Sequence, residues 1–159
     1  MNLIVAVDEK WGIGKDNDLL ISIPEDMKFF RTITKNSIII MGRKTLESFP
    51  NGKPLKNREN IVLTKSNIKE DVTIFNSIED VLNYVKNKEN VFVIGGGSIY
   101  KQLLPYCEKA YVTKIKKDFN ADVFFPNLDE KDDWELTNFD DNKEWNGISY
   151  QFTTYKHKL

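Results

Sequence analysis

Short apolar runs recur along the chain, separated by segments in which apolar residues return every three or four positions. Six of the runs are apolar on both faces, as strands in the middle of a parallel sheet are. They are LIVAV (3–7), SIIIMG (37–42), NIVLT (60–64), VTIF (72–75), VFVIGG (91–96) and AYVTKI (110–115). Two later segments, WELTNF (134–139) and SYQFTTYK (149–156), alternate apolar and polar residues and predict antiparallel strands with one wet face.

Helical segments lie between these strands. PEDMKFFRTIT begins near Pro24, where Ser22 and Glu25 have the spacing of a capping box. The others are RKTLESF (43–49), SIEDVLNYVKN (77–87), which opens on Ser77, and SIYKQLLPYC, which Pro105 breaks. This alternation predicts an α/β fold: a single domain over residues 1–159, with a mostly parallel, twisted sheet of about eight strands, an antiparallel C-terminal edge strand and about four flanking helices.

Charge and composition narrow the function classes. The 159 residues are 40% hydrophobic, and 23 Lys and Arg against 24 Asp and Glu give a net charge of −1. This balance of charges does not indicate binding to nucleic acid or to an anionic membrane surface. No apolar run approaches the roughly 18 residues of a transmembrane helix. The N-terminus MNLIVAVDEK lacks the basic region of a signal peptide, so we expect a cytoplasmic protein.

Cysteine and histidine are nearly absent. The single cysteine, Cys107, excludes an internal disulfide framework and suits a reducing compartment. The single histidine, His157, lies almost at the end of the chain, which argues against a catalytic triad or a His-ligated catalytic metal. No assembly element is visible in the sequence, so a monomer is expected.

Asp26 occupies an unusual place in its predicted helix. At about 100° per residue, Phe29, Phe30 and Ile33 all lie within about 60° of it, so the carboxylate falls in the apolar stripe. Burying an unpaired carboxylate is costly, so Asp26 must find a hydrogen-bond partner, become protonated or await a ligand. The alternative is an ordinary first-turn acid stabilised by the helix dipole, and the pattern alone does not decide between them.

Three consecutive glycines, Gly95, Gly96 and Gly97, connect a buried strand to a helix in VFVIGGGSIYKQLL. Glycines let backbone N–H groups approach an anion, and a helix N-terminus adds positive partial charge. The stretch is neither the dinucleotide fingerprint nor a P-loop. A tight turn is the alternative, but three glycines exceed what a turn needs, so we favour a pyrophosphate site.

Two other buried strands run into basic and hydroxyl residues. These are Arg43, Lys44 and Thr45 after one strand, and Thr64, Lys65 and Ser66 after the other. Ligands of open α/β sheets bind beyond the carboxyl ends of the strands, so these groups would suit a second phosphate, such as the 2′-phosphate of NADP. Without other evidence, an ordinary solvated loop is the simpler interpretation.

Taken together, these stretches resemble dihydrofolate reductase over essentially the whole chain. The resemblance rests on the order and spacing of several segments, each of which is weak alone. They are IVAVDEKWGIGKDN (4–17), IPEDMKFFR (23–31), IIIMGRKTLESF (38–49), PLKNRENIVLT (54–64), VFVIGGGSIY (91–100), YVTKI (111–115), ADVFFP (121–126) and DDWE (132–135).

The resemblance implies reduction of 7,8-dihydrofolate to tetrahydrofolate by NADPH, with hydride added to C6 and a proton to N5, in one-carbon metabolism. Asp26 would accept two adjacent N–H groups of the pterin and favour N5 protonation through its field, with water as the donor. Thr113 would hydrogen-bond this carboxylate, and Arg58 would bind the α-carboxylate of the glutamate tail. Catalytic roles fall to Asp26, Thr113 and Tyr100. The other substrate-binding residues implied are Ile4 and Val5, whose carbonyls and side chains would line the pocket, and Met27, Phe30, Phe49 and Leu55.

The same resemblance implies an extended NADPH site and no metal. Ala6, Ile13 and Gly14 would touch the nicotinamide end, and Tyr100 would lie near the ring. Cations and hydroxyls after the two strands would bind the adenosine phosphates. The full set is Ala6, Ile13, Gly14, Gly42, Arg43, Lys44, Thr45, Leu63, Thr64, Lys65, Ile94, Gly95, Gly96, Gly97, Ser98, Ile99 and Tyr100.

Two departures from the family pattern affect these expectations. Many members carry Leu-Pro-Trp before the helix of the acid, whereas this chain has Leu-Leu-Ile at 19–21, and Trp11 lies too early to replace the missing tryptophan. Ser98 stands where an arginine often supports the phosphates, so Lys65 is expected to carry more of that task.

The 8–23 segment, which contains two glycines, is long for a connection. We interpret it as a lid that gates ligand exchange, contacted by Asp122 from a neighbouring loop. A passive surface loop is the alternative.

Two rival functions remain at this stage. A reductase of the same fold could act on another pterin-like or pyrimidine substrate, but a substrate without a glutamate tail would not need Arg58. A non-catalytic nucleotide- or folate-binding protein could share the glycines but would not require Asp26.

Overall fold

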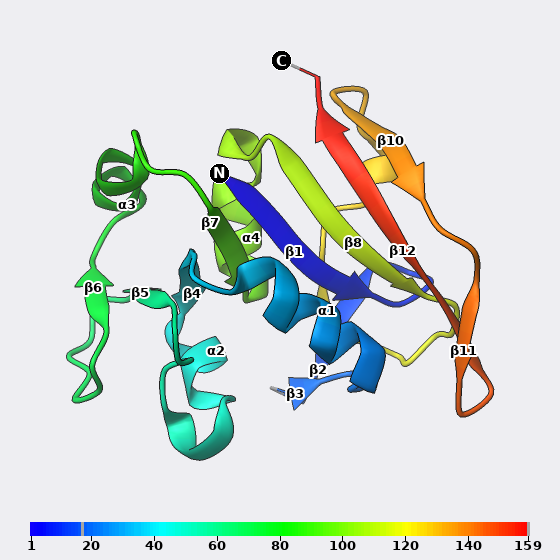
Figure 1. The fold of residues 1–159 in the computed structure, drawn as a ribbon, viewed down its shortest axis with the longest axis horizontal. Helices are drawn as coiled ribbons and strands as arrows, with labels where there is room; N and C mark the ends of the chain where they lie inside the picture. The colour runs from blue at the N-terminus through cyan, green and yellow to red at the C-terminus, as the bar shows by residue number, and fades with distance from the viewer. Residues whose placement is uncertain (17, 159) are drawn as a thin grey trace.

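The computed structural model describes residues 1–16 and 18–158. A nine-stranded sheet runs through the domain in the order β10-β12-β8-β1-β7-β4-β5-β6, with β11 paired to β12 (Figure 1). Its strands are β1 (Asn2–Val7), β4 (Ile38–Gly42), β5 (Glu59–Leu63), β6 (Thr73–Phe75), β7 (Val91–Gly95), β8 (Lys109–Ile115), β10 (Trp134–Phe139), β11 (Lys143–Trp145) and β12 (Ile148–His157). The six strands from β8 to β6 are parallel to their neighbours, and β10, β11 and β12 pair antiparallel.

Every apolar or alternating run expected to be a strand is one, and the mostly parallel α/β fold is confirmed. The two alternating segments form the antiparallel part. The C-terminal strand β12 lies one place inside the sheet, and β10 takes the edge. The exposed pattern of β10 agrees with this place, since only Trp134 of its six residues is buried.

Alternate side chains of the strands enter two apolar layers, as strand geometry requires. Leu3 and Val5 of β1 join the layer that contains Leu103 of α4 (Gly97–Leu103) and Val81 of α3 (Ile78–Val85). Ile4 joins the opposite layer, where α1 (Pro24–Thr34) and α2 (Arg43–Glu47) pack. Helices therefore cover both faces, and α1 crosses the nearer one in Figure 1. The 3₁₀ turns are η1 (Pro50–Gly52), η2 (Leu104–Tyr106) and η3 (Leu128–Glu130).

The two predicted helix starts have different outcomes. Ser77 caps α3 as expected, its hydroxyl accepting a hydrogen bond of 3.2 Å from the Asp80 N–H. The capping box of Ser22 and Glu25 is wrong: Ile23 is the N-cap of α1, and no side chain caps it. Ser22 lies one residue too early, and the Glu25 carboxylate instead accepts a hydrogen bond from Tyr150 at 2.7 Å.

A second, three-stranded sheet was not anticipated. It contains β3 (Asp18–Leu19), β2 (Gly12–Lys15) and β9 (Val123–Phe124), all antiparallel. The predicted lid over 8–23 therefore includes two short strands and is held by a segment more than 100 residues away. Residue 17, which is part of that predicted lid, lies outside the described residues. None of the helices in the described part of the chain has the length and apolar character that a membrane crossing demands.

Candidate active site

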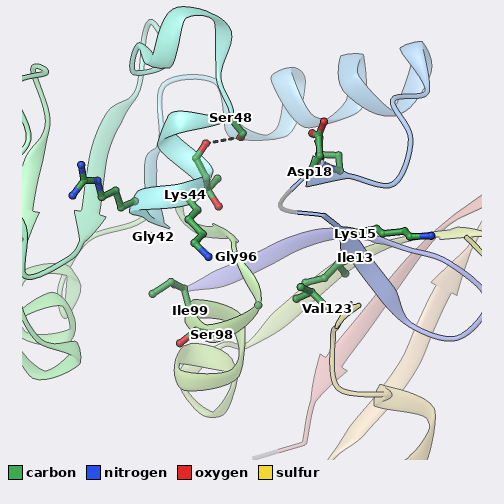
Figure 2. Close-up of a pocket in the computed structure, with 15 residues that line it drawn as sticks. Ile13, Lys15, Asp18, Gly42, Lys44, Ser48, Gly96, Ser98, Ile99 and Val123 are labelled. Carbon is green, nitrogen blue, oxygen red and sulfur yellow. Dashed lines mark hydrogen bonds between the residues drawn. The ribbon is translucent and has the colours of Figure 1, made fainter. Parts of the chain in front are cut away.

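A pocket of about 450 Å³ opens beyond the carboxyl ends of β4 and β7 (Figure 2). Helices α2 and α4 form one side, and the small β2–β3–β9 sheet forms the other. This is the edge at which open α/β sheets bind ligands. The lining residues are Ile13, Gly14, Lys15, Asp18, Leu19, Gly42, Arg43, Lys44, Thr45, Ser48, Gly96, Gly97, Ser98, Ile99 and Val123.

The glycine turn between β7 and α4 is closely surrounded. Gly95 has a φ of 136°, which only glycine adopts readily, and a Cβ there would lie 3.2 Å from Thr45 Oγ1. A Cβ on Gly97 would lie 2.7 Å from Val123 Cγ1, which is shorter than real contacts. Side chains at these two positions would therefore close the space between α2, α4 and β9. The bare backbone forms one wall of the pocket.

Cationic and hydroxyl side chains line the opposite wall. Lys44 extends from α2 towards Gly96 and Ile99, while Lys15 points away (Figure 2). Arg43 pairs with Glu47 at 3.6 Å on the surface of α2. Thr45 reaches the glycine turn, as described above. Lys44 and Thr45 thus face a backbone that offers N–H groups, a combination suited to phosphates.

The acid predicted to be central lies on the other side of β1. Asp26 is half-buried on α1, and Thr113 Oγ1 on β8 donates a hydrogen bond of 2.7 Å to its Oδ1. Burial raises the pKa of Asp26, and the bond from Thr113 partly offsets this rise. Within residues 1–16 and 18–158, no cationic side chain forms an ion pair with this carboxylate. Thr113 is therefore the hydrogen-bond partner that the described part of the chain provides for this carboxylate, and no cation accompanies it there.

Apolar and aromatic side chains surround this acid. Phe29, Phe30 and Ile33 pack in the α1–α2 layer, so the predicted apolar stripe is present. Phe49 and Leu55 pack against the same layer, and Met27 is 38% exposed on α1.

The side chains of Ile4 and Val5 do not line one pocket together. Ile4 packs in the α1–α2 layer, whereas Val5 packs in the α3–α4 layer, because neighbouring positions on a strand face opposite sides. Ala6, two residues after Ile4, is half-buried in the small cluster of Ile23 and Tyr150. The Ile4 and Val5 side chains therefore face opposite sides of β1, and the substrate-binding role expected of Val5 stays a prediction.

Arg58 lies at the end of α1 and is held by neutral acceptors. Its Nε donates to Thr34 Oγ1 at 3.0 Å, and its Nη1 donates to the Lys56 carbonyl at 3.0 Å. The guanidinium also lies 5.9 Å from the Phe30 ring centre. Burial and the nearby Arg31 lower the pKa of Arg58. No carboxylate of the described chain forms an ion pair with it, so an anionic ligand could do so.

Tyr100 links the two regions from the first turns of α4. Its buried hydroxyl is 2.7 Å from the carbonyl oxygen of Ile4 and 2.8 Å from that of Ile94. Burial, and then the charge of Asp26, raise the pKa of Tyr100. The phenol therefore stays protonated at neutral pH, and the catalytic role expected of Tyr100 stays a prediction.

Comparison with known proteins now identifies the family. A family model described as dihydrofolate reductase matches residues 1–157. The chain belongs to the dihydrofolate reductase family. Dihydrofolate reductase of Bacillus subtilis is 41% identical over 162 residues, covering 99% of this chain and 95% of that protein. That of Staphylococcus haemolyticus is 45% identical over 147 residues, covering 91% and 81%.

A solved structure gives the same result. Dihydrofolate reductase from Enterococcus faecalis, complexed with NADP(H) and RAB-propyl, superposes with a TM-score of 0.88 at 34% identity. The superposition covers 99% of this chain and 96% of that one. The resemblance inferred from the order of the motifs is confirmed.

Most residues predicted to bind the cofactor gather in one pocket. Those that line it are Ile13, Gly14, Gly42, Arg43, Lys44, Thr45, Gly96, Gly97, Ser98 and Ile99. Gly95 and Ile94 lie directly behind it on β7, and Leu63, Thr64 and Lys65 lie at the end of β5, outside its lining. Lys44 lines the pocket and points towards Gly96 in Figure 2, whereas Lys65 is not among the lining residues. The Ser98 hydroxyl accepts a hydrogen bond from Gln102 at 2.9 Å.

Some lining residues escaped sequence reasoning. Val123 lies in the ADVFFP motif, but its approach to Gly97 depends on β9 pairing with β2, which no local pattern signals. Ser48, Lys15, Asp18 and Leu19 also line the pocket. Leu19, from the stretch that lacks the family tryptophan, is 59% exposed at its rim.

The expected contact between Asp122 and the lid is present. Asp122 Oδ2 accepts a hydrogen bond of 3.0 Å from the Asp16 N–H, and the Asp122 N–H donates to the Gly14 carbonyl at 2.9 Å. Trp11 is buried beneath the lid and stacks on Phe125 at 6.1 Å, so it supports the loop from below.

Proposed function

We propose that this chain reduces 7,8-dihydrofolate to 5,6,7,8-tetrahydrofolate with NADPH, adding hydride to C6 and a proton to N5. The observation that carries the proposal is the half-buried Asp26 carboxylate, which accepts a bond from Thr113 and lacks a cationic partner in the described chain. A carboxylate in this state suits a ligand with two adjacent N–H donors on a flat apolar ring. Family membership supplies the ligand of that description.

The substrate would extend from Asp26 towards Arg58. Phe30 lies beside Arg58, with its ring centre 5.9 Å from the guanidinium, and it shares α1 with the acid. Phe49 and Leu55 pack against the same layer and would contact the benzoyl ring. The forked donors of Arg58 would then bind the α-carboxylate of the glutamate tail.

The cofactor would occupy the pocket between α2, α4 and β2. Gly96 and Gly97 would present their backbone to the pyrophosphate, with Lys44 and Thr45 opposite. Ala6, Ile13 and Gly14 would face the nicotinamide. When bound, NADPH supplies the hydride, and the chain orients it and excludes water.

Asp26 would assist protonation through its charge. Because burial raises its pKa, the carboxylate holds a proton more readily than a solvated aspartate. It would bind the edge of the pterin remote from N5, so a water molecule is the direct donor, and the ionised acid stabilises the cation that forms.

One assay tests the proposal. Wild-type protein should oxidise NADPH, seen as falling absorbance, only when dihydrofolate is added. Asp26→Asn should lower hydride transfer by about a hundredfold or more at neutral pH, and by less at acidic pH, where the substrate arrives protonated. Full turnover by this variant at neutral pH would contradict the role assigned. A same-fold reductase would instead respond to a pterin without a glutamate tail, and a binding protein would show no turnover.

We also propose a cytoplasmic monomer that binds no nucleic acid. The net charge of −1 and the single, buried Cys107 support this. Light scattering in solution and cell fractionation test it, and a stable dimer or a membrane-bound pool would contradict it.

A further inference from the structure

A second buried carboxylate lies outside all the roles above. Asp8 follows β1 directly and is only 2% exposed, yet it forms no ion pair with any residue of 1–16 or 18–158. A buried charge without a cation needs several hydrogen-bond donors to compensate for lost hydration. Here the backbone supplies these donors.

The donors are three backbone N–H groups from two separate segments. Asp8 Oδ1 accepts from Lys10 at 2.9 Å and from Gly12 at 2.7 Å, at the entry of β2. Its Oδ2 accepts from Phe119 at 3.1 Å, in the loop that leads to β9. One carboxylate thus joins the start of β2 to the loop that precedes β9, the strand paired with β2.

Those two strands form one wall of the cofactor pocket. Ile13 and Gly14 of β2 and Val123 of β9 line it, opposite the glycine turn. The spacing is tight, because a Cβ on Gly12 would lie 2.4 Å from Ala121 Cβ and 2.9 Å from both Asp8 carboxylate oxygens. A small shift at Asp8 would therefore be transmitted to the strands and to the position of Ile13.

We propose that Asp8 is a positioning residue for the cofactor, which fixes the β2–β9 wall against the nicotinamide end of NADPH. The proposal rests on the reductase function proposed above. Asp8 acts at a distance, through backbone N–H groups, and does not touch the ligand. Its effect belongs to the cofactor side of the site, since Asp26 and Arg58 are held by other elements.

The substitution Asp8→Asn should keep the hydrogen bonds from Lys10 and Gly12 and remove the one from Phe119. The amide oxygen can still accept from Lys10 and Gly12, but the amide N–H₂ then faces the Phe119 N–H, and that bond is lost. We expect the Kd for NADPH, measured by fluorescence titration, to rise about tenfold, the size of one lost hydrogen bond to a charged group. Hydride transfer should slow, while the KM for dihydrofolate stays within about twofold.

A matched control joins the same two segments at the surface. Lys10 Nζ pairs with Asp118 at 2.9 Å, and its side chain is 67% exposed. Lys10→Met should leave the Kd for NADPH and the turnover unchanged, because exposed ion pairs contribute little. An equal effect of Lys10→Met and Asp8→Asn would show that any link between the loops suffices, and would overturn the specific role of the carboxylate.

The remaining outcomes are also decisive. If Asp8→Asn lowers Tm but binds NADPH as the wild type does, Asp8 is structural only and the proposal fails. A wild type that binds NADPH without turnover rejects the reductase but leaves the binding test valid, and a wild type that binds no NADPH rejects both. If the variant does not fold, hydrogen exchange on the wild type decides: the Gly12 and Phe119 amides should gain protection together when NADPH is added, and unchanged protection would overturn the proposal.

Discussion

Thr113 on β8 and Asp26 on α1 are 87 positions apart in sequence, and the hydroxyl of one donates to the carboxylate of the other at 2.7 Å. This bond lowers the pKa of Asp26 against the larger, opposite effect of burial. Thr113→Val should therefore raise the pKa of Asp26 further, whereas Thr113→Ser should keep it close to that of the wild type. Carboxyl NMR titration measures both, and an unchanged midpoint in the valine variant would exclude the bond in solution.

The ionised form of Asp26 should lower the free energy of unfolding at neutral pH relative to acidic pH. A folded-state pKa above the unfolded value means that ionised Asp26 costs stability, and this cost appears as the pH rises from about 3.8 through the folded pKa. Asp26→Asn should thus raise the free energy of unfolding at pH 7, with a smaller gain below pH 3.8. Urea unfolding at the two pH values checks this. A loss of stability at pH 7 would show that the carboxylate is satisfied within the fold.

Gly97 tests the closeness of β9 to the cofactor pocket. An added methyl group would lie 2.7 Å from Val123 Cγ1, so Gly97→Ala should push the two elements apart. We expect a loss of about 1–3 kcal/mol in stability and about tenfold weaker NADPH binding. Adding Val123→Ala should restore both, because it removes the opposing atom. Calorimetry and cofactor titration measure this, and failure of the double variant to recover would place the cause elsewhere.

Arg58 should act on the tail of the substrate alone. Its guanidinium is already oriented by Thr34 and the Lys56 carbonyl, so Arg58→Lys loses the planar fork but keeps the charge. The KM for dihydrofolate should rise about tenfold or more with little change in kcat. The control is a dihydropterin without the glutamate tail, for which both enzymes should perform alike. An equal loss with that substrate would argue against tail recognition.

Asp122 should influence ligand release. Its bond to the Asp16 N–H is exposed and worth about 1 kcal/mol, so Asp122→Ala should speed cofactor and product release roughly fivefold. Stopped-flow displacement measures these rates. Asp118→Ala removes an acid of the same loop that pairs with Lys10 and provides the control. Unchanged release rates in Asp122→Ala would leave the lid as a passive loop.

The hydrophobic pattern alone predicted the structure correctly for elements whose burial follows from their own residues. The run Ile38–Met41 is apolar at every position, and the strand it forms is covered by both layers. The helical wheel likewise placed Asp26 among aromatic residues before any contact was known. Ser22 shows the limit of such patterns, because a shift of one residue in where the helix begins removes the cap.

Long-range pairing was not readable from the residues alone. The strands β3 and β9 have two residues each, too few to show any alternation, and β2 carries two glycines. They pair through backbone hydrogen bonds, and Asp8, which looks like an ordinary acid in a turn, accepts bonds from Gly12 and Phe119 beside them. The family resemblance suggested the pterin as the expected partner of Asp26, which local chemistry had left open.

Tyr100 also connects β1 and β7 where their backbone pairing ends. Backbone pairing between β1 and β7 runs only through Asn2 with Phe92 and Leu3 with Val93, and a single phenol then spans the carbonyls of Ile4 and Ile94. Beyond the last backbone pair, one hydroxyl group therefore takes the place of the inter-strand hydrogen bonds, and its size limits how far β1 and β7 separate at this point.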